Sequence, residues 1–274
     1  MTWGENLKVG IIGLGVVGNA IKNAFEEVHE VFVHDIAIGT TLEDVTKNCD
    51  VAYICVPTPT DNETGRCDLS IVKSVLESLP NGFSVVIKST VEPGSTQIFH
   101  DEFTALRVAC SPEYLREDYA QEDFKNQDIL VVGTHHDDLA ALVLKQHEMA
   151  GVLGGGQFFH VSPTEAEITK YAMNCFYSMK VVFGNQLQRL SGKLGANWSS
   201  VKEVITYQRK RGINDSHLEE IPGKMGFDGS CLPKDAVALT SLMAGLGIDS
   251  SLFKGVLEDN EYLSEMVNSD TQTS

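Results

Sequence analysis

Apolar residues in the first part of the chain form short runs, and several of the intervening segments have a helical period. The runs lie at residues 7–12, 31–35, 51–56, 83–87, 107–110 and 129–132. The clearest helical patterns between them cover residues 70–79 and 137–149. Because strands that alternate with helices form parallel sheets covered on both faces, this part of the sequence predicts an α/β fold with a doubly wound parallel sheet.

The character of the chain changes after Pro163, where one helical pattern extends over residues 164–194. Ser162 or Thr164 can cap this helix, with Glu165 and Glu167 near its positive end. Its length exceeds that of a typical globular helix and indicates an interface or a domain-spanning role. Further helical patterns cover residues 198–206, 236–246 and 250–266. We therefore expect an α/β domain over residues 1–163 and an all-helical domain over residues 164–274.

A glycine motif follows the first apolar run directly and precedes a helical pattern. Strand, G-x-G-x-x-G and helix in this order are typical of the Rossmann dinucleotide site, in which the helix N-terminus binds the pyrophosphate. The second predicted strand ends in an acid, which suits a ribose 2′-hydroxyl and repels a 2′-phosphate. We therefore predict NAD as the cofactor, and the residues expected to bind it are Gly13, Gly15, Val16, Val17, Gly18 and Asp35.

Three further strand ends carry polar or proline-rich turns. They are Val56-Pro57-Thr58-Pro59, Lys88-Ser89-Thr90-Val91-Glu92-Pro93-Gly94-Ser95 and Ser111-Pro112-Glu113-Tyr114-Leu115-Arg116-Glu117. Each by itself is an ordinary turn. In open α/β folds, however, ligands bind at the carboxyl ends of the strands, so three such turns in succession indicate a site.

Cys231 lies in a glycine-rich turn, with Lys234 and Asp235 three and four residues later. A cysteine is more often a small buried apolar residue than a reactive one. Here the flanking residues favour the reactive interpretation, because the thiolate is the nucleophile and a nearby cation stabilises it.

Composition and charge narrow the class of protein. The content of 42% hydrophobic and 22% charged residues is ordinary for a globular protein, and no apolar stretch is long enough for a membrane span. The six cysteines contain no C-x-x-C pair, which argues against a zinc site or a disulfide framework. The N-terminus shows no signal-peptide pattern, so we expect a cytoplasmic protein without a metal. The net charge of −17 argues against nucleic acid and anionic membranes as partners.

The quoted motifs together resemble those of the nucleotide-sugar 6-dehydrogenases, the UDP-glucose/GDP-mannose dehydrogenase family. Residues 226–235 match the family's G-F-G-G-x-C-x-P-K-D signature except at Asp228, where the family has glycine. The three turns match V-P-T-P, K-S-T-V-x-P-G-S/T and S/N-P-E-F-L-R-E, with Tyr114 in place of phenylalanine. Residues 165–186 are similar to the family's E-x-x-K-x-x-x-N helix that ends in F-x-N-E, with Gln186 in place of the glutamate.

The resemblance extends from Lys8 to about Leu263 and stops where the family begins a second Rossmann-like domain. We therefore expect a short form without the C-terminal UDP-binding domain. The implied activity is the two-step, four-electron oxidation of UDP-glucose to UDP-glucuronate with NAD, through a thioester on Cys231. The second domain is implied to bind substrate and to form a homodimer.

The family's residue roles carry over to matching positions. Lys170 and Asn174 are expected to stabilise oxyanions at C6 of the sugar. Asp235 acts as a general base, directly or through water, and Glu113 assists hydrolysis, while Thr90 holds a water or the sugar. The additional residues implied to contact NAD are Val56, Pro57, Thr58, Thr90, Glu117 and Lys234. The residues implied to contact substrate are Glu113, Tyr114, Leu115, Lys170, Asn174, Arg211, His217, Phe227, Gly229 and Cys231.

Residues 209–211 form the only dense basic cluster of the chain. In the family an arginine near this point, followed by a pair like Ser216-His217, reaches the nucleotide-sugar across a dimer interface. Arg209 and Arg211 both remain candidates for that arginine. A dianionic substrate needs local cations on so acidic a chain, so we expect the cluster to be the diphosphate clamp.

Three alternatives remain open at this point. A GDP-mannose 6-dehydrogenase, or one for another nucleotide-sugar, shares every motif quoted. A two-electron β-hydroxyacid dehydrogenase also combines a Rossmann domain with a K-x-x-x-N helix, but needs no cysteine. An inactive nucleotide-sugar binding module is suggested by Asp228 and the expected short form. The joint presence of Cys231, Lys170 and Asp235 argues against it.

Overall fold

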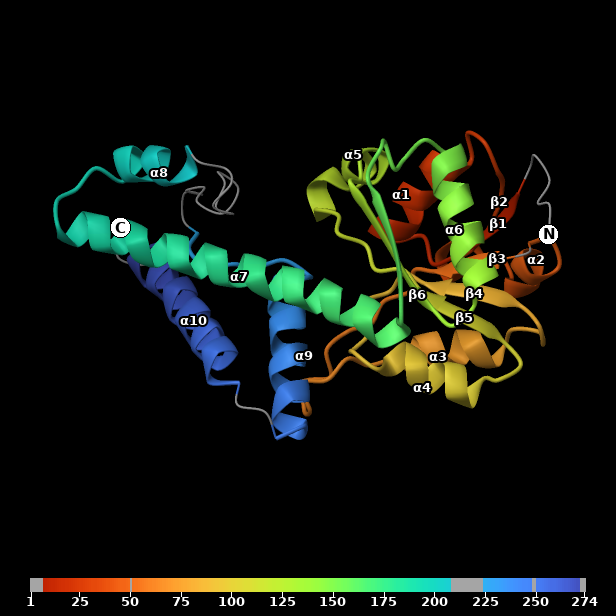
Figure 1. Cartoon of the computed structure of the whole chain (residues 1–274). Helices are drawn as coiled ribbons and strands as arrows, with labels where there is room; N and C mark the ends of the chain where they lie inside the picture. The colour runs from red at the N-terminus through yellow and green to blue at the C-terminus, as the bar shows by residue number, and fades with distance from the viewer. Residues whose placement is uncertain (1–6, 50, 208–223, 248–249, 272–274) are drawn as a thin grey trace. The chain divides into compact units, whose positions relative to one another are not determined.

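Figure 1 shows the computed structural model of the chain, in which residues 7–49, 51–207, 224–247 and 250–271 are described. The chain divides into two compact units. The first comprises Met1–Asp61 and Cys67–Lys170, and the second Asn62–Arg66 and Tyr171–Ser274. The boundary expected between residues 163 and 164 coincides with the start of the long helix, whereas the compact units divide within that helix, after Lys170.

The first unit contains a seven-stranded sheet in the order β2-β1-β3-β4-β5-β6-β7. Its strands are β1 (Lys8–Ile12), β2 (Glu30–His34), β3 (Val51–Ile54), β4 (Ser84–Ile87), β5 (Arg107–Cys110), β6 (Ile129–Thr134) and β7 (Gln157–Val161). The first five are parallel, β6 pairs antiparallel with β5, and β7 is parallel to β6. The strand order reverses between β1 and β3, which is the switch point where open α/β sheets bind ligands.

Helices cover both faces of this sheet (Figure 1). One face carries α1 (Val16–Phe25), α5 (Ala120–Lys125) and α6 (Asp137–Met149), and the other α2 (Leu42–Thr46), α3 (Ser70–Glu77) and α4 (Ser95–Glu102). Short 3-10 turns follow β2 at Ile36–Ile38 and precede α5 at Glu117–Tyr119. Because β3 and β4 are buried along their whole length, they read as continuous apolar runs in the sequence.

The second unit is helical in its described part. It contains the larger part of α7 (Pro163–Lys193), together with α8 (Trp198–Thr206), α9 (Leu232–Gly245) and α10 (Ser251–Thr271). Its apolar core is small and centres on Val182, Phe227 and Leu263. The loop Asn62–Arg66 belongs to this unit as well, and Gly65 packs against Ser241 of α9.

The predicted fold class is confirmed, with two differences in detail. The sheet is mixed rather than wholly parallel, because β6 and β7 run against the other strands. Strand β7 was not predicted from the sequence, because all of its residues are half-buried or exposed and polar residues interrupt its apolar ones. Ser162 caps α7 in a reciprocal pair with Glu165: the Ser162 amide donates to Glu165 Oε2 at 2.8 Å. None of the described helices is both long enough and apolar enough to span a bilayer.

Candidate functional site

The glycine loop between β1 and α1 has the geometry of a phosphate-binding turn. Gly13 has φ +96°, and a Cβ there would lie 2.6 Å from the Cys55 carbonyl oxygen. A Cβ on Gly18 would lie 1.9 Å from the Gly13 carbonyl oxygen, so only glycine lets α1 pack this closely. Gly15 has open space around it, and no side chain caps the α1 amides that follow, including those of Val16 and Val17. These backbone donors fit the pyrophosphate of a dinucleotide.

Asp35 follows β2 and is fixed beside this loop. Its Oδ2 accepts a hydrogen bond from the Leu14 amide at 2.6 Å, and its Oδ1 accepts one from the Ala37 amide at 2.8 Å. These two bonds hold the pKa of the carboxyl below its usual value. The ionised acid can therefore accept hydrogen bonds from the ribose hydroxyls of a bound dinucleotide, and the residues present fit NAD.

The turns after β3 and β4 are tied to each other. Thr58 Oγ1 donates to the Thr90 carbonyl at 2.7 Å, and Ser89 Oγ donates to the Val56 carbonyl at 2.7 Å. Thr58 is buried, whereas Pro57 between these contacts is exposed. The structure thus brings together the residues expected at this edge from two separate strands.

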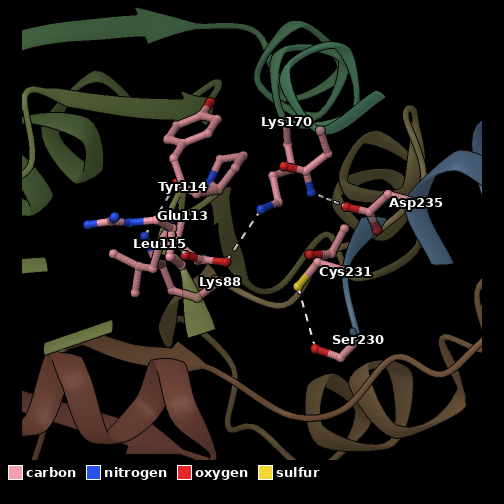
Figure 2. A network of polar contacts seen from close by, with 12 residues as sticks. Lys88, Glu113, Tyr114, Leu115, Lys170, Ser230, Cys231 and Asp235 are labelled. Carbon is pink, nitrogen blue, oxygen red and sulfur yellow. Dashed lines mark hydrogen bonds and ion pairs between the residues drawn. The ribbon is translucent and has the colours of Figure 1, made fainter. Parts of the chain in front are cut away.

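A buried ion pair lies after β5 (Figure 2). Glu113 Oε1 lies 3.4 Å from Lys170 Nζ, and its Oε2 accepts from the Leu115 amide at 2.7 Å. The side chains are only 10% and 5% exposed, respectively. Tyr114 hydrogen-bonds through its hydroxyl to Thr169 Oγ1 at 2.7 Å, and its ring centroid lies 5.8 Å from Lys170 Nζ. Two candidates of this turn, Glu113 and Tyr114, therefore contact the N-terminal part of α7.

Lys88, at the end of β4, is a second buried cation near Glu113. It is 3% exposed, and its Nζ lies 3.5 Å from the Pro112 carbonyl oxygen. Burial lowers the pKa of its ammonium group to about 8, although the negative charge of Glu113 opposes the shift. No role for Lys88 was predicted from the sequence. The available signal was a lysine that directly follows a fully buried strand.

Glu167 binds a helix other than its own. Its two carboxylate oxygens accept from the amides of Gly94 at 2.6 Å and Thr96 at 2.7 Å, at the start of α4. We expected Glu167 to act at the N-terminus of its own helix, but Glu165 alone occupies that position. Burial raises the pKa of Glu167 to about 7, against the effect of its hydrogen bonds.

A hollow of about 300 Å³ opens beside the start of α1. Its walls come from α1 and from the segment after the β5 turn, namely Val16, Asn19, Glu117, Asp118, Tyr119, Ala120, Gln121 and Glu122. Two residues predicted to contact the cofactor, Val16 and Glu117, therefore line one depression.

In the second unit Cys231 occupies the N-cap position of α9. The thiol is half-buried, and its Sγ lies 3.6 Å from Ser230 Oγ (Figure 2). Pro233 stands in the first turn, where a missing amide leaves no hydrogen bond unmade. The side chain at an N-cap lies next to the unpaired amides of the first helical turn.

Asp235 lies one turn further along α9 and is 1% exposed. Its Oδ2 accepts from Asn174 Nδ2 of α7, and its Oδ1 lies 3.4 Å from Lys234 Nζ. The Asp235 amide donates to the Cys231 carbonyl at 2.9 Å. Asn174, Lys234 and Asp235 are thus assembled on one side of the helix start that carries the thiol.

The remaining predicted features lie outside the described residues or differ from the family's signature. Arg209, Lys210, Arg211, Ser216 and His217 lie outside the described residues. Asp228, the departure from the signature, is exposed and pairs with Lys224 at 2.6 Å. Gly229 has φ +83° and open space around it. Among the described side chains, no group of three or more His, Cys, Asp and Glu is arranged to hold a metal.

The fold and these residues define a dinucleotide-binding α/β protein with a helical second unit. Family models match both parts of the chain: the NAD-binding domain of the UDP-glucose/GDP-mannose dehydrogenase family matches residues 33–149, and the family's central domain matches residues 164–262. The chain belongs to the UDP-glucose/GDP-mannose dehydrogenase family.

Individual relatives support this assignment. The chain is 34% identical to UDP-glucose 6-dehydrogenase of Rickettsia typhi over 223 residues, which cover 78% of this chain and 50% of the relative. It is 28% identical to UDP-glucose 6-dehydrogenase TuaD of Bacillus subtilis, with 94% of this chain and 55% of the relative covered. The chain therefore spans about half the length of these relatives. The structure of a UDP-glucose dehydrogenase from Pyrobaculum islandicum matches with a TM-score of 0.81 at 26% identity, covering 96% of this chain and 70% of that one.

Proposed function

We propose that the protein oxidises the C6 alcohol of UDP-glucose to the carboxylate of UDP-glucuronate. The observation that carries this proposal is a thiol at the start of α9, within a family signature, next to an Asn174–Asp235–Lys234 cluster. The curated relatives are UDP-glucose 6-dehydrogenases, which favours UDP-glucose over GDP-mannose.

In this proposal the first unit holds the cofactor. The amides at the start of α1 bind the pyrophosphate, Asp35 accepts from the ribose, and the residues around Val56, Thr90 and Glu117 line the rest of the site. NAD+, when bound, accepts one hydride at each of the two oxidation steps. Lys234 of the second unit is proposed as a further contact to the cofactor.

Cys231 supplies the covalent chemistry. The first oxidation converts the C6 alcohol to an aldehyde, with loss of a hydride and a proton. The Cys231 sulfur then adds to the aldehyde carbon and forms a thiohemiacetal. Loss of the remaining hydride from C6 and of the proton from the C6 hydroxyl gives a thioester, and water cleaves its carbon–sulfur bond to give the carboxylate and the free thiol.

Polar side chains from both units are proposed to stabilise the charges and transfer the protons of these steps. Lys170 and Asn174 stabilise the oxyanions at C6, since fixed donors favour charge that develops in a transition state. Asp235 takes the proton of the reacting hydroxyl, directly or through water, and Glu113 assists attack by water on the thioester. Thr90 holds a water or the sugar.

Two features of the proposal involve the substrate's nucleotide and a second chain. The cluster Arg209 to Arg211 is proposed to bind the diphosphate, with His217 as a neighbouring contact. The chain is proposed to act as a homodimer built on α7.

The test combines purified protein with NAD+ and a panel of UDP- and GDP-sugars. The expected result is two NADH per UDP-glucuronate formed from UDP-glucose. A preference for GDP-mannose would reassign the substrate within the family. One NADH per substrate, with no requirement for Cys231, would indicate a two-electron dehydrogenase. Tight binding of UDP-glucose without turnover would indicate a binding module.

A further inference from the structure

The chain segment that leads to Cys231 is held by one side chain of α10. Asn260 Oδ1 accepts a hydrogen bond from the Phe227 amide at 2.6 Å, and Asn260 Nδ2 donates to the Phe227 carbonyl at 3.0 Å. A single carboxamide therefore satisfies both backbone groups of Phe227. The two residues are far apart in sequence, so only the tertiary fold brings them together.

Gly226, which precedes Phe227, has no side chain and so leaves room for Asn260 to make this contact. It has φ +84°, and a Cβ at this position would lie 2.4 Å from Asn260 Oδ1. Gly229 has almost the same φ, +83°, but no atom within 4 Å of its would-be Cβ. Gly229 is therefore required only by its backbone conformation, whereas Gly226 is required both by its conformation and by the close approach of Asn260.

The Phe227 side chain provides a second anchor for the same segment. It is 4% exposed and packs with Val182 and Leu263 in the core of the second unit. Ser264, one turn after Asn260, donates to the Met225 carbonyl at 3.5 Å. The segment before Cys231 is thus anchored to α10 through main chain and side chain, and α9 begins immediately after Cys231.

We propose that Asn260 is a positioning residue that holds the Cys231 loop through Phe227. The proposal rests on the proposed function, because it assumes that Cys231 is the nucleophile. The contact with Phe227 requires one hydrogen-bond acceptor and one donor at the tip of a short side chain, and the carboxamide of asparagine supplies both. Aspartate keeps the acceptor and loses the donor, and alanine loses both.

The first experiment compares Asn260→Ala and Asn260→Asp with Asp259→Asn, a change at an exposed neighbour on the same helix. We expect kcat for UDP-glucose oxidation to fall about 10- to 100-fold in Asn260→Ala, since a misplaced reacting group is costly. KM for NAD+ should change by less than about threefold, because the glycine loop and Asp35, which are predicted to bind the cofactor, belong to the other unit. Asn260→Asp should lie between wild type and Asn260→Ala, and Asp259→Asn should match wild type.

A second readout does not depend on turnover. The rate at which iodoacetamide alkylates Cys231 is followed by peptide mass spectrometry, with half-buried Cys67 of the other unit as the internal standard. Release of the loop exposes the half-buried thiol, so we expect the Cys231 rate to rise at least about threefold in Asn260→Ala. The Cys67 rate should stay constant.

A double-mutant cycle tests the contact itself. Gly226→Ala should lower the melting temperature more in the wild type than in Asn260→Ala, by about 2–4 °C, because the clash exists only with Asn260 present. Gly229→Ala, which adds strain without a clash, should lower it equally in both backgrounds.

An unchanged Cys231 alkylation rate in Asn260→Ala would overturn the proposal, whatever the enzyme activity. An altered rate with unchanged kcat would also overturn it, because the loop would then not need to be held. If wild type itself fails to oxidise UDP-glucose, the proposed function fails, and the alkylation and the glycine cycle still decide whether Asn260 positions the thiol.

Discussion

At the scale of single residues, the environments of the cysteines differ enough to single out one thiol. Burial raises the pKa of the Cys55 and Cys175 thiols to about 12 and also raises that of Cys110, so these sulfurs stay protonated. Cys231 and Cys67 are half-buried, and Cys231 alone of the two stands at a helix N-cap.

This contrast leads to a substitution test. Cys231→Ser should lower UDP-glucuronate formation by about three orders of magnitude, because a hydroxyl is a far weaker nucleophile and an ester is not the activated intermediate that a thioester is. Mass spectrometry of the sugar products and NADH absorbance measure the effect, and Cys67→Ser serves as the matched control. A Cys231→Ala protein that forms the uronate at the wild-type rate would remove the thiol from the mechanism.

Cofactor choice is also decided by one residue. Asp35→Asn keeps an oxygen that can accept from the Leu14 amide but removes the charge that disfavours a 2′-phosphate. We expect kcat/KM for NAD+ to fall about 10- to 100-fold and the ratio of NADP+ to NAD+ use to rise, since a charged hydrogen bond is lost. Asp44→Asn, at an exposed helix cap, is the control. Equal use of both cofactors by the wild type would contradict the role of Asp35.

At the scale of elements, α4 lacks a cap of its own and depends on α7. Gly94 precedes α4 in the left-handed conformation, and the two carboxylate oxygens of Glu167 supply the acceptors. Glu167 belongs to the same first turns of α7 as Lys170, which pairs with Glu113. Two buried ionisable side chains of one helix therefore connect it to the turns after β4 and β5.

The raised pKa of Glu167 gives a prediction for stability against pH. A group whose pKa is about 7 in the folded protein, above its unfolded value, contributes stability that is present at low pH and lost as pH rises through 7. The unfolding free energy of wild type relative to Glu167→Gln should therefore decrease by about 1–3 kcal/mol between about pH 5 and pH 8.

Urea unfolding at several pH values measures this difference. Glu165→Gln is the matched control, because Glu165 is an exposed capping residue whose pKa is lowered by Ser162, so its effect should stay constant in this window. A difference for Glu167→Gln that is independent of pH, or that grows as pH rises, would show that the carboxylate is not desolvated.

The elements that could be predicted from the sequence are those fixed by local constraints. The β1–Gly13–α1 unit was predictable because its glycines follow from backbone geometry, and α6 and α8 because their periodicity is uninterrupted. The start of α9 was placed too late because Pro233 reads as a turn residue, whereas it stands in the first helical turn.

Other features could not be predicted because they depend on pairs distant in sequence. The target of Glu167 lies on another helix, and the hold of Asn260 on Phe227 requires the folded second unit. Similarly, the burial of Lys88 and its proximity to Glu113 depend on the folded sheet and cannot be deduced from the sequence. The catalytic set itself was predicted from motifs, and the roles of its members remain predictions.

At the scale of the whole molecule, the acidic surface constrains how an anionic substrate binds. With a net charge of −17, the chain must gather cations where the diphosphate lies. We expect Arg211→Ala to raise KM for UDP-glucose at least tenfold, since a charge-assisted arginine contact is lost, and to leave KM for NAD+ nearly unchanged. KM for UDP-glucose should also rise with salt, which screens charges beyond about 8 Å at physiological ionic strength.

Steady-state kinetics over a range of salt concentrations checks this expectation. Arg116→Ala, which removes an exposed arginine paired with Asp123, controls for the loss of one positive charge. An unchanged KM for UDP-glucose in the alanine variants of Arg209, Lys210 and Arg211 would place the clamp elsewhere.

We expect the assembly of the molecule to depend on α7, which carries a buried and an exposed set of apolar residues. Its inner face carries Tyr171, Cys175 and Val182, all less than 5% exposed. Its outer face carries Ile168, Phe176 and Phe183, which are 51%, 49% and 50% exposed. These three positions are seven or eight residues apart, so they lie on one side of α7. Large apolar side chains that are exposed together on one side of a helix indicate an interaction surface.

We therefore expect a homodimer that buries this outer face. Phe176→Glu and Phe183→Glu should shift the protein at micromolar concentration from twice the chain mass toward 29.9 kDa, because each places a charge in an apolar interface. Light scattering coupled to gel filtration measures the mass, and Val204→Glu, at a 74% exposed position on α8, is the control. A wild-type mass of 29.9 kDa would contradict the dimer, and a dimer that survives both glutamate substitutions would place its interface on another surface.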